Sequence, residues 1–598
     1  MARIVPQTIC FARPILGSRC ELPSIAAVNS FWLELITMTT KGKIVLTLLI
    51  LGVLGFGVVK WLPKLQSPGG APQNSASQSA TPGQTATAPA PAASVQAAEL
   101  VETQTEIPKL AAAGAYLPKD NTVEIELSEY AGYAGLVVAN GGLAPNENSV
   151  FFKKHGFKVA IKLSEEESWS ALNSGKMAAS ATTVDVLATY GRQFQVVVPA
   201  QIGFSRGADG VVVRNDIKRI NQLKGKILAT AQFTEADFFI RYLAQEAGLG
   251  INMMPDLKTA ADPDKLNLVF CKDAFAAGDF FLREVNAGRN LLAGCVTWAP
   301  KTTEVADGSG GKAHVLTTSK NLLIVGDVLI VNKGFAQQNP KMVAGLVEGL
   351  LEGNRMVRDN PTTWVDVIGK AFKWDRAETQ AELAKVHLSN LPENLAFFSG
   401  AIDAAGSFGG IYQSAVFAYG SALIKDPVDA DRFADLQHLK SLETAGTFKD
   451  QKVAIAPIRS SGTAPVETDP LLSKDIRFLF SPNSANLDLN NQDNLKNLEA
   501  IKRLLQVSPG STILLRGHVD NSMVEEFRKR GGEAFVRQMA LKAVDFSKQR
   551  ANEIKRLLVE RHKIDAQRLD AVGRGWEEPL GPDNDQNRRV EAQWFTLE

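Results

Sequence analysis

Two stretches of this chain cannot pack a hydrophobic core, and they divide its 598 residues into separate folding units. Residues 66–98 consist almost entirely of Pro, Ala, Ser, Gln, Thr and Gly, a composition that predicts a flexible tether. A second break at 446–470, with Ser460-Ser461-Gly462-Thr463 near its centre, is typical of a linker. Because the chain is too long for one core, we expect two or more domains around these breaks.

The first apolar segment, residues 44–62, is long enough to cross a bilayer as a helix at about 1.5 Å per residue. Lys41 and Lys43 precede it, which favours a cytoplasmic N-terminus. No small-x-small site closes the segment, so we expect an uncleaved inner-membrane anchor rather than a signal peptide, with the bulk of the chain in the periplasm. Residues 1–43 would form a cytoplasmic leader, with translation starting at Met1 or Met38, and residues 63–116 the linker.

Residues 117–445 alternate short apolar strands with amphipathic helices. Residues 123–127 and 158–162 have the pattern of strands, whereas 341–359 have the pattern of a helix. Such alternation predicts an α/β architecture with parallel sheets. The region is large enough for two lobes of roughly 150 residues each, with a cleft between them.

Three phrases in this region carry a family resemblance: Asn173-Ser174-Gly175-Lys176-Met177, Gly207-Ala208-Asp209-Gly210-Val211 and Leu223-Lys224-Gly225-Lys226-Ile227. With them, the region resembles the periplasmic solute-binding proteins of ABC transporters, in the nitrate, taurine, sulfonate and thiamine-precursor group. The resemblance implies a two-lobed, type II-like fold and an ABC permease as partner. By analogy the ligand is a small anion or organic acid.

The same resemblance places ligand-binding residues in loops that face the expected cleft. Hydroxyls and backbone N–H groups at helix starts can bind a polar head, and aromatic rings can cover an apolar part. The expected ligand-binding residues are Tyr130, Tyr133, Thr182, Thr183, Asp185, Phe233, Thr234 and Trp298, with Asp185 binding an ammonium or hydroxyl group. The sequence leaves an alternative open, in which the aromatic residues are lobe core and the threonines are only helix caps.

Residues 471–598 carry three spaced motifs in a βαβαβ-like pattern: Gly517-His518-Val519-Asp520, Phe546-Ser547-Lys548-Gln549-Arg550-Ala551 and Asn587-Arg588-Arg589-Val590-Glu591. The apolar run 512–515 predicts a strand, so Asp520 should lie in the loop just beyond it. Ser547 is expected to begin a helix that carries Arg550 in its first turns. A carboxylate on a loop and a guanidinium on a nearby helix can bind the two poles of a zwitterion.

This segment resembles the OmpA-like family, which binds the diaminopimelate side chain of peptidoglycan. The resemblance implies an α+β fold in which Asp520 binds the ligand ammonium, Arg550 binds its carboxylate and Arg588 lines the pocket. Val519 stands where the family has Thr, and an insertion at 525–530 lengthens the spacing between the motifs. The alternative is a structural ion pair of Asp520 with Arg550 and no ligand.

Other classes of function find little support in the sequence. The six histidines lack metal-ligand spacing, no Gly-x-Ser-x-Gly elbow occurs, and a net charge of +1 gives no indication of nucleic-acid binding. His518 and Asp520 lack a third ligand. We therefore predict no catalytic residues, no metal and no cofactor. Cys271 and Cys295 are compatible with a disulfide or with two free buried thiols.

Together these features predict a membrane-tethered periplasmic solute-binding protein of an ABC-type uptake system, anchored to peptidoglycan. The first alternative is a structural tether that links the inner membrane to the cell wall, in which the two lobes are a spacer. A stator-like part is a weaker alternative, because residues 44–59 contain no carboxylate that could serve it in the membrane.

Overall fold

The computed structural model describes residues 99–164, 168–401, 406–455, 470–480 and 484–595. The chain divides into two units, residues 1–89 and 90–598. The expected leader 1–43, the anchor 44–62 and the first part of the linker lie outside the described residues. Among the helices that are described, none combines the length and the apolar character needed to cross a membrane.

The first lobe is built on a six-stranded sheet in the order β12-β4-β11-β3-β1-β2. Its strands are β1 (Thr122–Leu127), β2 (Lys158–Leu163), β3 (Ala179–Thr183), β4 (Val196–Ser205), β11 (Gly326–Asn332) and β12 (Val386–Leu388). β1 pairs in parallel with β2 and β3, but β11 is antiparallel to β3 and β4.

The second lobe has a sheet in the order β10-β5-β9-β6-β8-β7. Its strands are β5 (Asp209–Arg214), β6 (Ile227–Ala231), β7 (Gly250–Met253), β8 (Lys265–Cys271), β9 (Gly294–Trp298) and β10 (Ala313–Thr318). β6 is parallel to β8 and β9, whereas β5 is antiparallel to β9 and β10. The expectation of parallel sheets therefore holds for only part of each sheet, because both sheets are mixed. The chain leaves the first lobe after β4 and returns as β11, and the strands that begin after a crossing, β5 and β11, run antiparallel to both of their neighbours.

The chain crosses between the lobes twice, between β4 and β5 and between β10 and β11. The crossings are joined by a backbone bond from the Ser319 N–H to the Asp209 carbonyl (2.9 Å) and by a contact of 2.6 Å between the Ser205 and Ser319 hydroxyls. Asp209 opens β5 directly after the first crossing, and Asp327 lies at the start of β11 directly after the second. The topology therefore brings two carboxyl groups from different lobes to the same place.

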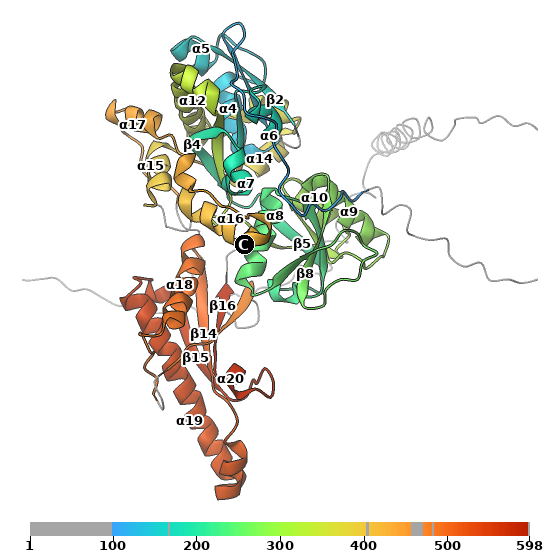
Figure 1. Ribbon diagram of the computed structural model, residues 1–598, viewed down its shortest axis with the longest axis vertical. Helices are drawn as coiled ribbons and strands as arrows, with labels where there is room; N and C mark the ends of the chain where they lie inside the picture. Colours follow the sequence, from blue (N-terminus) through green and yellow to red (C-terminus); the bar gives the residue numbers. More distant parts are fainter. Residues whose placement is uncertain (1–98, 165–167, 402–405, 456–469, 481–483, 596–598) are drawn as a thin grey trace, which may run out of the picture. The chain divides into compact units, whose positions relative to one another are not determined.

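Helices flank both sheets (Figure 1). Those of the first lobe and its C-terminal extension are α4 (Ala134–Asn140), α5 (Val150–His155), α6 (Trp169–Asn173), α7 (Val184–Tyr190), α11 (Lys333–Gln338), α12 (Pro340–Asp359), α13 (Pro361–Phe372), α14 (Arg376–Leu383), α15 (Leu391–Ser399), α16 (Phe408–Leu423) and α17 (Gln437–Thr444). Those of the second lobe are α8 (Glu235–Glu246), α9 (Ala274–Asn286) and α10 (Lys301–Gly308). The helix predicted at 341–359 is confirmed as α12.

Residues 99–116 fall within the predicted linker, but they make specific contacts with both lobes. The Val101 N–H donates to the Phe270 carbonyl at 2.9 Å, and the Gly114 N–H donates to the Asn173 carbonyl at 3.0 Å. These backbone groups are satisfied by the lobes rather than by water, so the segment packs as part of the binding domain.

Cys271 and Cys295 are both buried free thiols. They lie on β8 and β9, which flank β6 in the sheet. Of the two possibilities that the sequence left open, the structure has the free thiols.

The C-terminal domain has the element order β13 (Leu472–Ile476), α18 (Gln492–Val507), β14 (Thr512–His518), α19 (Val524–Glu560), β15 (Leu569–Gly575), α20 (Asn584–Asn587) and β16 (Val590–Phe595). Its sheet has the order β13-β16-β14-β15, in which β14 and β15 are parallel and β16 is antiparallel to β13 and β14. The strand predicted at 512–515 is confirmed as β14. The final strand β16 follows the expected βαβαβ pattern and fills the centre of the sheet, with Trp594 fully buried.

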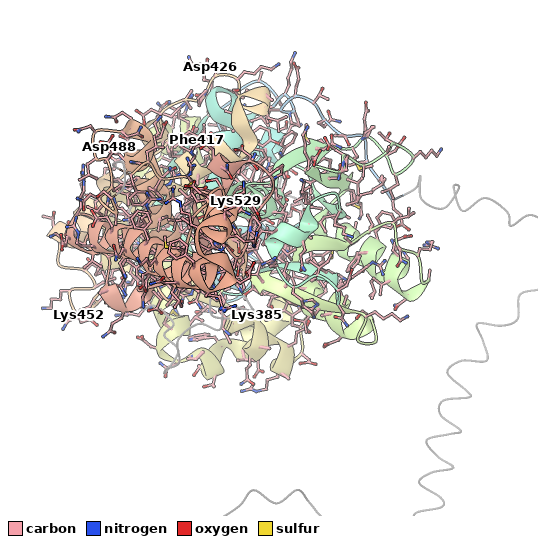
Figure 2. The ribbon with its side chains drawn as sticks, turned by 90° about the horizontal axis from the view of Figure 1, so that it is seen from below. Lys385, Phe417, Asp426, Lys452, Asp488 and Lys529 are labelled. Carbon is pink, nitrogen blue, oxygen red and sulfur yellow. The ribbon has the colours of Figure 1, made fainter. Side chains whose placement is uncertain are left out.

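The prediction that Ser547 begins a helix is wrong. The insertion is itself helical, so α19 starts at Val524, bends at Gly531-Gly532 and continues along β14 and β15 (Figure 1). The side chain of Ser547 is buried in mid-helix, where its hydroxyl donates to the Val544 carbonyl (2.9 Å) and accepts from the Gly575 N–H (3.0 Å). The N-terminal part of α19 is exposed, as Lys529 shows in Figure 2.

The close packing of α12 on α4 gives a test of the first lobe. A Cβ added at Gly353 would lie 2.0 Å from the Gly135 carbonyl oxygen, so Gly353→Ala should lower the free energy of unfolding by about 1–3 kcal/mol. The matched control is Gly409→Ala in α16, where no atom lies within 4 Å of the added Cβ and helix propensity favours Ala. Urea denaturation measures both, and equal midpoints for the two variants would contradict the packing described.

Candidate functional site

A cavity opens where the two lobes meet, next to the crossings, and its empty space is about 470 Å³ when the adjoining open solvent is included. Its lining residues are Ser128, Tyr130, Tyr133, Thr182, Thr183, Asp209, Glu235, Trp298, Val325 and Asp327. Five of the eight residues expected from the sequence are among them, namely Tyr130, Tyr133, Thr182, Thr183 and Trp298. Both lobes therefore contribute side chains to one cavity.

The lining includes carboxyl groups that sequence reasoning missed. Asp327 is a lone acid within the apolar run 324–331. Asp209 lies inside the motif 207–211, which served only as evidence for the family resemblance. A single carboxylate inside an apolar strand is a usable signal, because such a group is rarely buried without a reason. Glu235 follows the expected residue Thr234 directly and begins α8.

Aromatic side chains from both lobes line the cavity. Tyr130 and Tyr133 lie next to the short 3₁₀ helix η2 (Ala131–Tyr133), with their rings edge to face at 5.1 Å. Trp298 ends β9 and packs at 5.1 Å from the ring of Phe275. Both tyrosines are buried and belong to the apolar core of the first lobe. The two tyrosines are therefore part of the lobe core and also line the cavity, so the two interpretations left open by the sequence both apply to them.

Asp209 and Asp327 carry hydrogen bonds from hydroxyl groups. The Tyr130 hydroxyl donates to Oδ2 of Asp327 at 3.4 Å. Hydroxyls of Ser205 and Ser319 interact with the carboxyl of Asp209. Both acids are almost fully buried. The nearby hydroxyls are neutral, so they orient the carboxyl groups without neutralising them.

Asp185 is a third buried acid beside the cavity. It lies in the first turn of α7, two residues after the lining residue Thr183. It is 0% exposed, and among the described residues neither of its carboxyl oxygens has a hydrogen-bond partner. Its negative charge adds to the forces that raise the pKa of Asp327. Asp185 is therefore close enough to interact with the cavity without lining it.

Burial raises the pKa of all three acids. It raises the pKa of Asp185 to about 7 and that of Asp209 to about 6. Burial, followed by the negative charge of Asp209, raises the pKa of Asp327 well above its usual value. These groups cost free energy when ionised together in the empty cavity, because each charge loses water and repels the others.

A fourth buried acid, Asp237 on α8, differs because it has a cationic partner. Its Oδ1 accepts from Nε of Arg241 at 2.6 Å, and its Oδ2 accepts from the Phe233 N–H at 3.0 Å. This bond holds Phe233 in the left-handed conformation, with φ at 64°. The expected ligand residues Phe233 and Thr234 thus shape the loop before α8 and do not line the cavity.

The threonines at the helix starts do not act as side-chain caps. Thr183 precedes α7 and Thr234 precedes α8, but neither hydroxyl accepts from a helix N–H group. Oγ1 of Thr234 donates to the Ala231 carbonyl at 2.9 Å. Oγ1 of Thr183 is buried without a partner in the part of the chain that the structure describes. Thr183 therefore retains an unused polar atom at the cavity wall.

In the C-terminal domain, Asp520 lies two residues beyond the end of β14, as expected. Its Oδ2 accepts from Nε of Arg588 at 2.6 Å, and its Oδ1 accepts from the Ser522 N–H at 3.1 Å. Although burial opposes the change, the hydrogen bonds of Arg588 and Ser522 lower the pKa of Asp520. Among the described residues, the ion pair of Asp520 is with Arg588 and not with Arg550, which corrects the alternative of an Asp520–Arg550 pair.

Arg550 lies between two aromatic rings in the same region. Its guanidinium is 4.4 Å from the ring centre of Phe546 and 4.8 Å from that of Phe480. Its Nε donates weakly to the Ser484 carbonyl at 3.4 Å. Burial lowers the pKa of Arg550, followed by the charge of Arg588, while Asp520 opposes this shift. The three predicted residues Asp520, Arg550 and Arg588 therefore form one electrostatic cluster. The guanidinium of Arg550, which packs against aromatic rings, can bind an anion there.

His518 faces Glu578 and Glu591, and the ligand atoms of the three lie within 4.8 Å of one another. A metal would meet the guanidinium of Arg516 there, because Arg516 bonds Glu591 at 2.6 Å and Glu578 at 2.8 Å. The positive charge that the two carboxylates need is thus already supplied by a side chain. We assign no metal to this cluster.

Comparison with known families identifies two separate segments. Residues 143–363 match the NMT1/THI5 like family, and residues 479–593 match the OmpA family. The outer membrane protein Omp38 of Acinetobacter baumannii is 27% identical over 148 residues, which cover 23% of this chain and 36% of Omp38. The chain thus carries an NMT1/THI5-like domain followed by an OmpA domain.

Solved structures with a similar fold include a binding protein and an enzyme. The alkanesulfonate-binding protein SsuA from Xanthomonas axonopodis pv. citri, bound to MOPS, has 14% identity and a TM-score of 0.40, covering 54% of this chain and 100% of SsuA. The desulfurization enzyme DSZB has 14% identity and a TM-score of 0.36, covering 54% of this chain and 99% of DSZB. Values this low carry no information about the ligand.

The raised pKa values predict an unusual pH dependence of stability. A carboxyl whose pKa rises on folding binds more protons in the folded state, so its contribution to stability falls as pH rises between the ordinary and the raised value. For Asp185 this interval runs from 3.8 to about 7. We expect Asp185→Asn to raise the melting temperature at pH 8, by a free energy on the order of 1–3 kcal/mol, and to have little effect at low pH.

The control is Asp426→Asn, which changes an exposed carboxylate (Figure 2) that forms an ion pair with exposed Arg192. Scanning calorimetry from pH 4, near the lower end of the interval in which Asp185 titrates, to pH 8, above its upper end, measures the difference between each variant and the parent. A difference for Asp185→Asn that does not grow with pH would show that Asp185 is not strained when ionised.

Proposed function

We propose that this chain, which joins an NMT1/THI5-like domain to an OmpA-family domain, is a periplasmic receptor for a small solute that is held at peptidoglycan. The observation that carries this proposal is the cavity at the meeting of the lobes, to which both lobes contribute aromatic and acidic side chains. Two crossing segments joined by Ser205 and Ser319 form a natural hinge, about which the lobes would close over a ligand.

In this proposal residues 44–62 anchor the chain in the inner membrane. Residues 66–98 would then act as a tether with a reach on the order of 30–35 Å, by random-coil scaling. The receptor would stay between the membrane and the wall and deliver its solute to an ABC permease. The charge pattern around residues 44–62 supports this arrangement.

The C-terminal cluster supports binding of a diaminopimelate side chain, whose outer end is a zwitterion. The ligand ammonium would bind the carboxylate of Asp520 and displace Arg588 from it. The ligand carboxylate would bind the guanidinium of Arg550, which the rings of Phe480 and Phe546 hold in place. Arg588, once released, would add a second guanidinium to the carboxylate.

This binding mode predicts that Asp520→Asn and Arg550→Ala each weaken association with peptidoglycan about tenfold or more, because each leaves one pole of the zwitterion unpaired. Co-sedimentation of the purified chain with isolated diaminopimelate-type peptidoglycan measures the dissociation constant. Arg556→Ala is the matched control, since Arg556 lies on the same helix α19 and forms only surface ion pairs with Glu553 and Glu560. Wild-type binding by both site variants would refute the zwitterion clamp.

The receptor role predicts that a low-mass extract of the cell envelope raises the melting temperature of the chain in a concentration-dependent way. A ligand that binds only the folded state stabilises it by mass action. Trp298→Ala should remove most of the response, because Trp298 lines the cavity. Phe417→Ala is the control, since Phe417 is an exposed aromatic residue on α16 (Figure 2).

The absence of any response in the parent chain would favour the structural alternative. In that case the two lobes would be a spacer, and the chain would link the membrane to the wall without carrying a solute.

A further inference from the structure

We propose that the cavity selects an organic cation, a small molecule that carries an ammonium or amidinium group next to an apolar part. This inference rests on the receptor function proposed above and names the chemical class of its ligand. It differs from the anion or organic acid expected by analogy. Three features of the cavity support it: the charges of its lining, the buried carboxyl group of Asp185 next to it, and its aromatic side chains.

The charges at the cavity are of one sign. Asp209, Asp327 and Glu235 line it, and none of the described lining residues is Lys, Arg or His. The buried guanidinium of Arg241 does not line the cavity; it is bonded to Asp237 and lies over the ring of Tyr419 at 5.1 Å. A sulfonate or nitrate placed here would meet several carboxyl groups and no cation, whereas a cation would relieve their mutual repulsion.

Asp185 is the independent observation that points to a ligand. A fully buried carboxyl group without hydrogen bonds is costly, and native structures seldom keep one without a purpose. It follows the lining residue Thr183 by two positions, and while burial raises the pKa of Asp185, the Thr183 hydroxyl is close enough to oppose that shift. Among the described residues, however, neither group completes a hydrogen bond of good geometry. The Thr183 hydroxyl at the cavity, with this carboxyl group next to it, can therefore still accept from the N–H donors of an ammonium or amidinium group.

The aromatic lining indicates an organic cation and not a bare metal ion. The side chains of Tyr130, Tyr133 and Trp298 line the same volume as the carboxyl groups. Aromatic faces attract organic cations electrostatically and also cover their apolar parts. A hard metal ion would instead need several oxygen ligands in a fixed shell.

If the cavity binds a cation, its affinity for that cation should depend on pH in a definite direction. The titratable and charged groups that face Asp185 and Asp209 are Asp327 on β11, Glu235, Asp237 and Arg241 on α8, and Tyr419 on α16. A cation binds best when the cavity acids are ionised, so its affinity should rise as pH increases through the values near 6 and 7 given above for Asp209 and Asp185. An anion that accepts hydrogen bonds from protonated carboxyls would show the opposite trend.

The test divides the low-mass envelope extract before it is added to the purified chain. One portion passes through a cation exchanger, one through an anion exchanger and one through a chelating resin that removes metal ions. We expect only the cation exchanger to remove the ability to raise the melting temperature. The remaining response should be larger at pH 7.5 than at pH 5.5, two values chosen to bracket the titration of the cavity acids.

The variants Asp327→Asn and Asp185→Asn should lose at least tenfold in the apparent affinity for the active extract, whereas Asp426→Asn should keep it. Both site variants are expected to fold, because each replaces a buried acid with a neutral group of the same shape.

The organic-cation proposal is overturned if the anion exchanger or the chelating resin removes the activity, or if no column removes it. Each of these outcomes leaves the receptor function intact. An untreated extract without any effect would instead reject the receptor function.

Discussion

The repulsion among buried carboxyl groups at the lobe crossings is the constraint on which the binding domain depends. Asp209 and Asp327 come to the same place because each opens a strand directly after the chain changes lobe. The strands that carry them, β5 and β11, are also antiparallel to their neighbours and make both sheets mixed. The same two chain crossings therefore determine the sheet topology and the position of the acids. The backbone near these acids is fixed by the bonds of Ser205 and Ser319. The fold therefore keeps the acids together although their charges favour separation.

The two functional regions of the chain treat charge in opposite ways. In the C-terminal domain, the carboxylate of Asp520 is partly exposed and already paired with Arg588, so its pKa is lowered. Beside the cleft, Asp185 is buried without a cationic partner among the residues that the structure describes, and burial raises its pKa. The first arrangement suits exchange of one ion pair for another on a charged polymer. The second stores unfavourable free energy that a ligand of opposite charge would release.

The sequence predicted the parts of the molecule that local patterns determine. The strand before Asp520, the helix at 341–359, and Tyr130, Tyr133 and Trp298 at the cavity all follow from residue pattern or from family motifs. The start of α19 was missed because the inserted residues continue the helix upstream of Ser547. Asp327 was missed because its partners, Asp209 and Tyr130, are distant in sequence and meet only when β11 returns to the first lobe. The pairing of Asp520 with Arg588 likewise depends on the position of the last strand.

A crystal structure of the chain purified from its own envelope, without dialysis, would show whether the acids of the cleft bind a cation. We expect a ligand between Tyr130 and Trp298, with a nitrogen about 3 Å from the carboxyl oxygens of Asp209 or Asp327. An anion bound to protonated carboxyl groups, or a closed cavity filled by its own side chains, would refute cation binding.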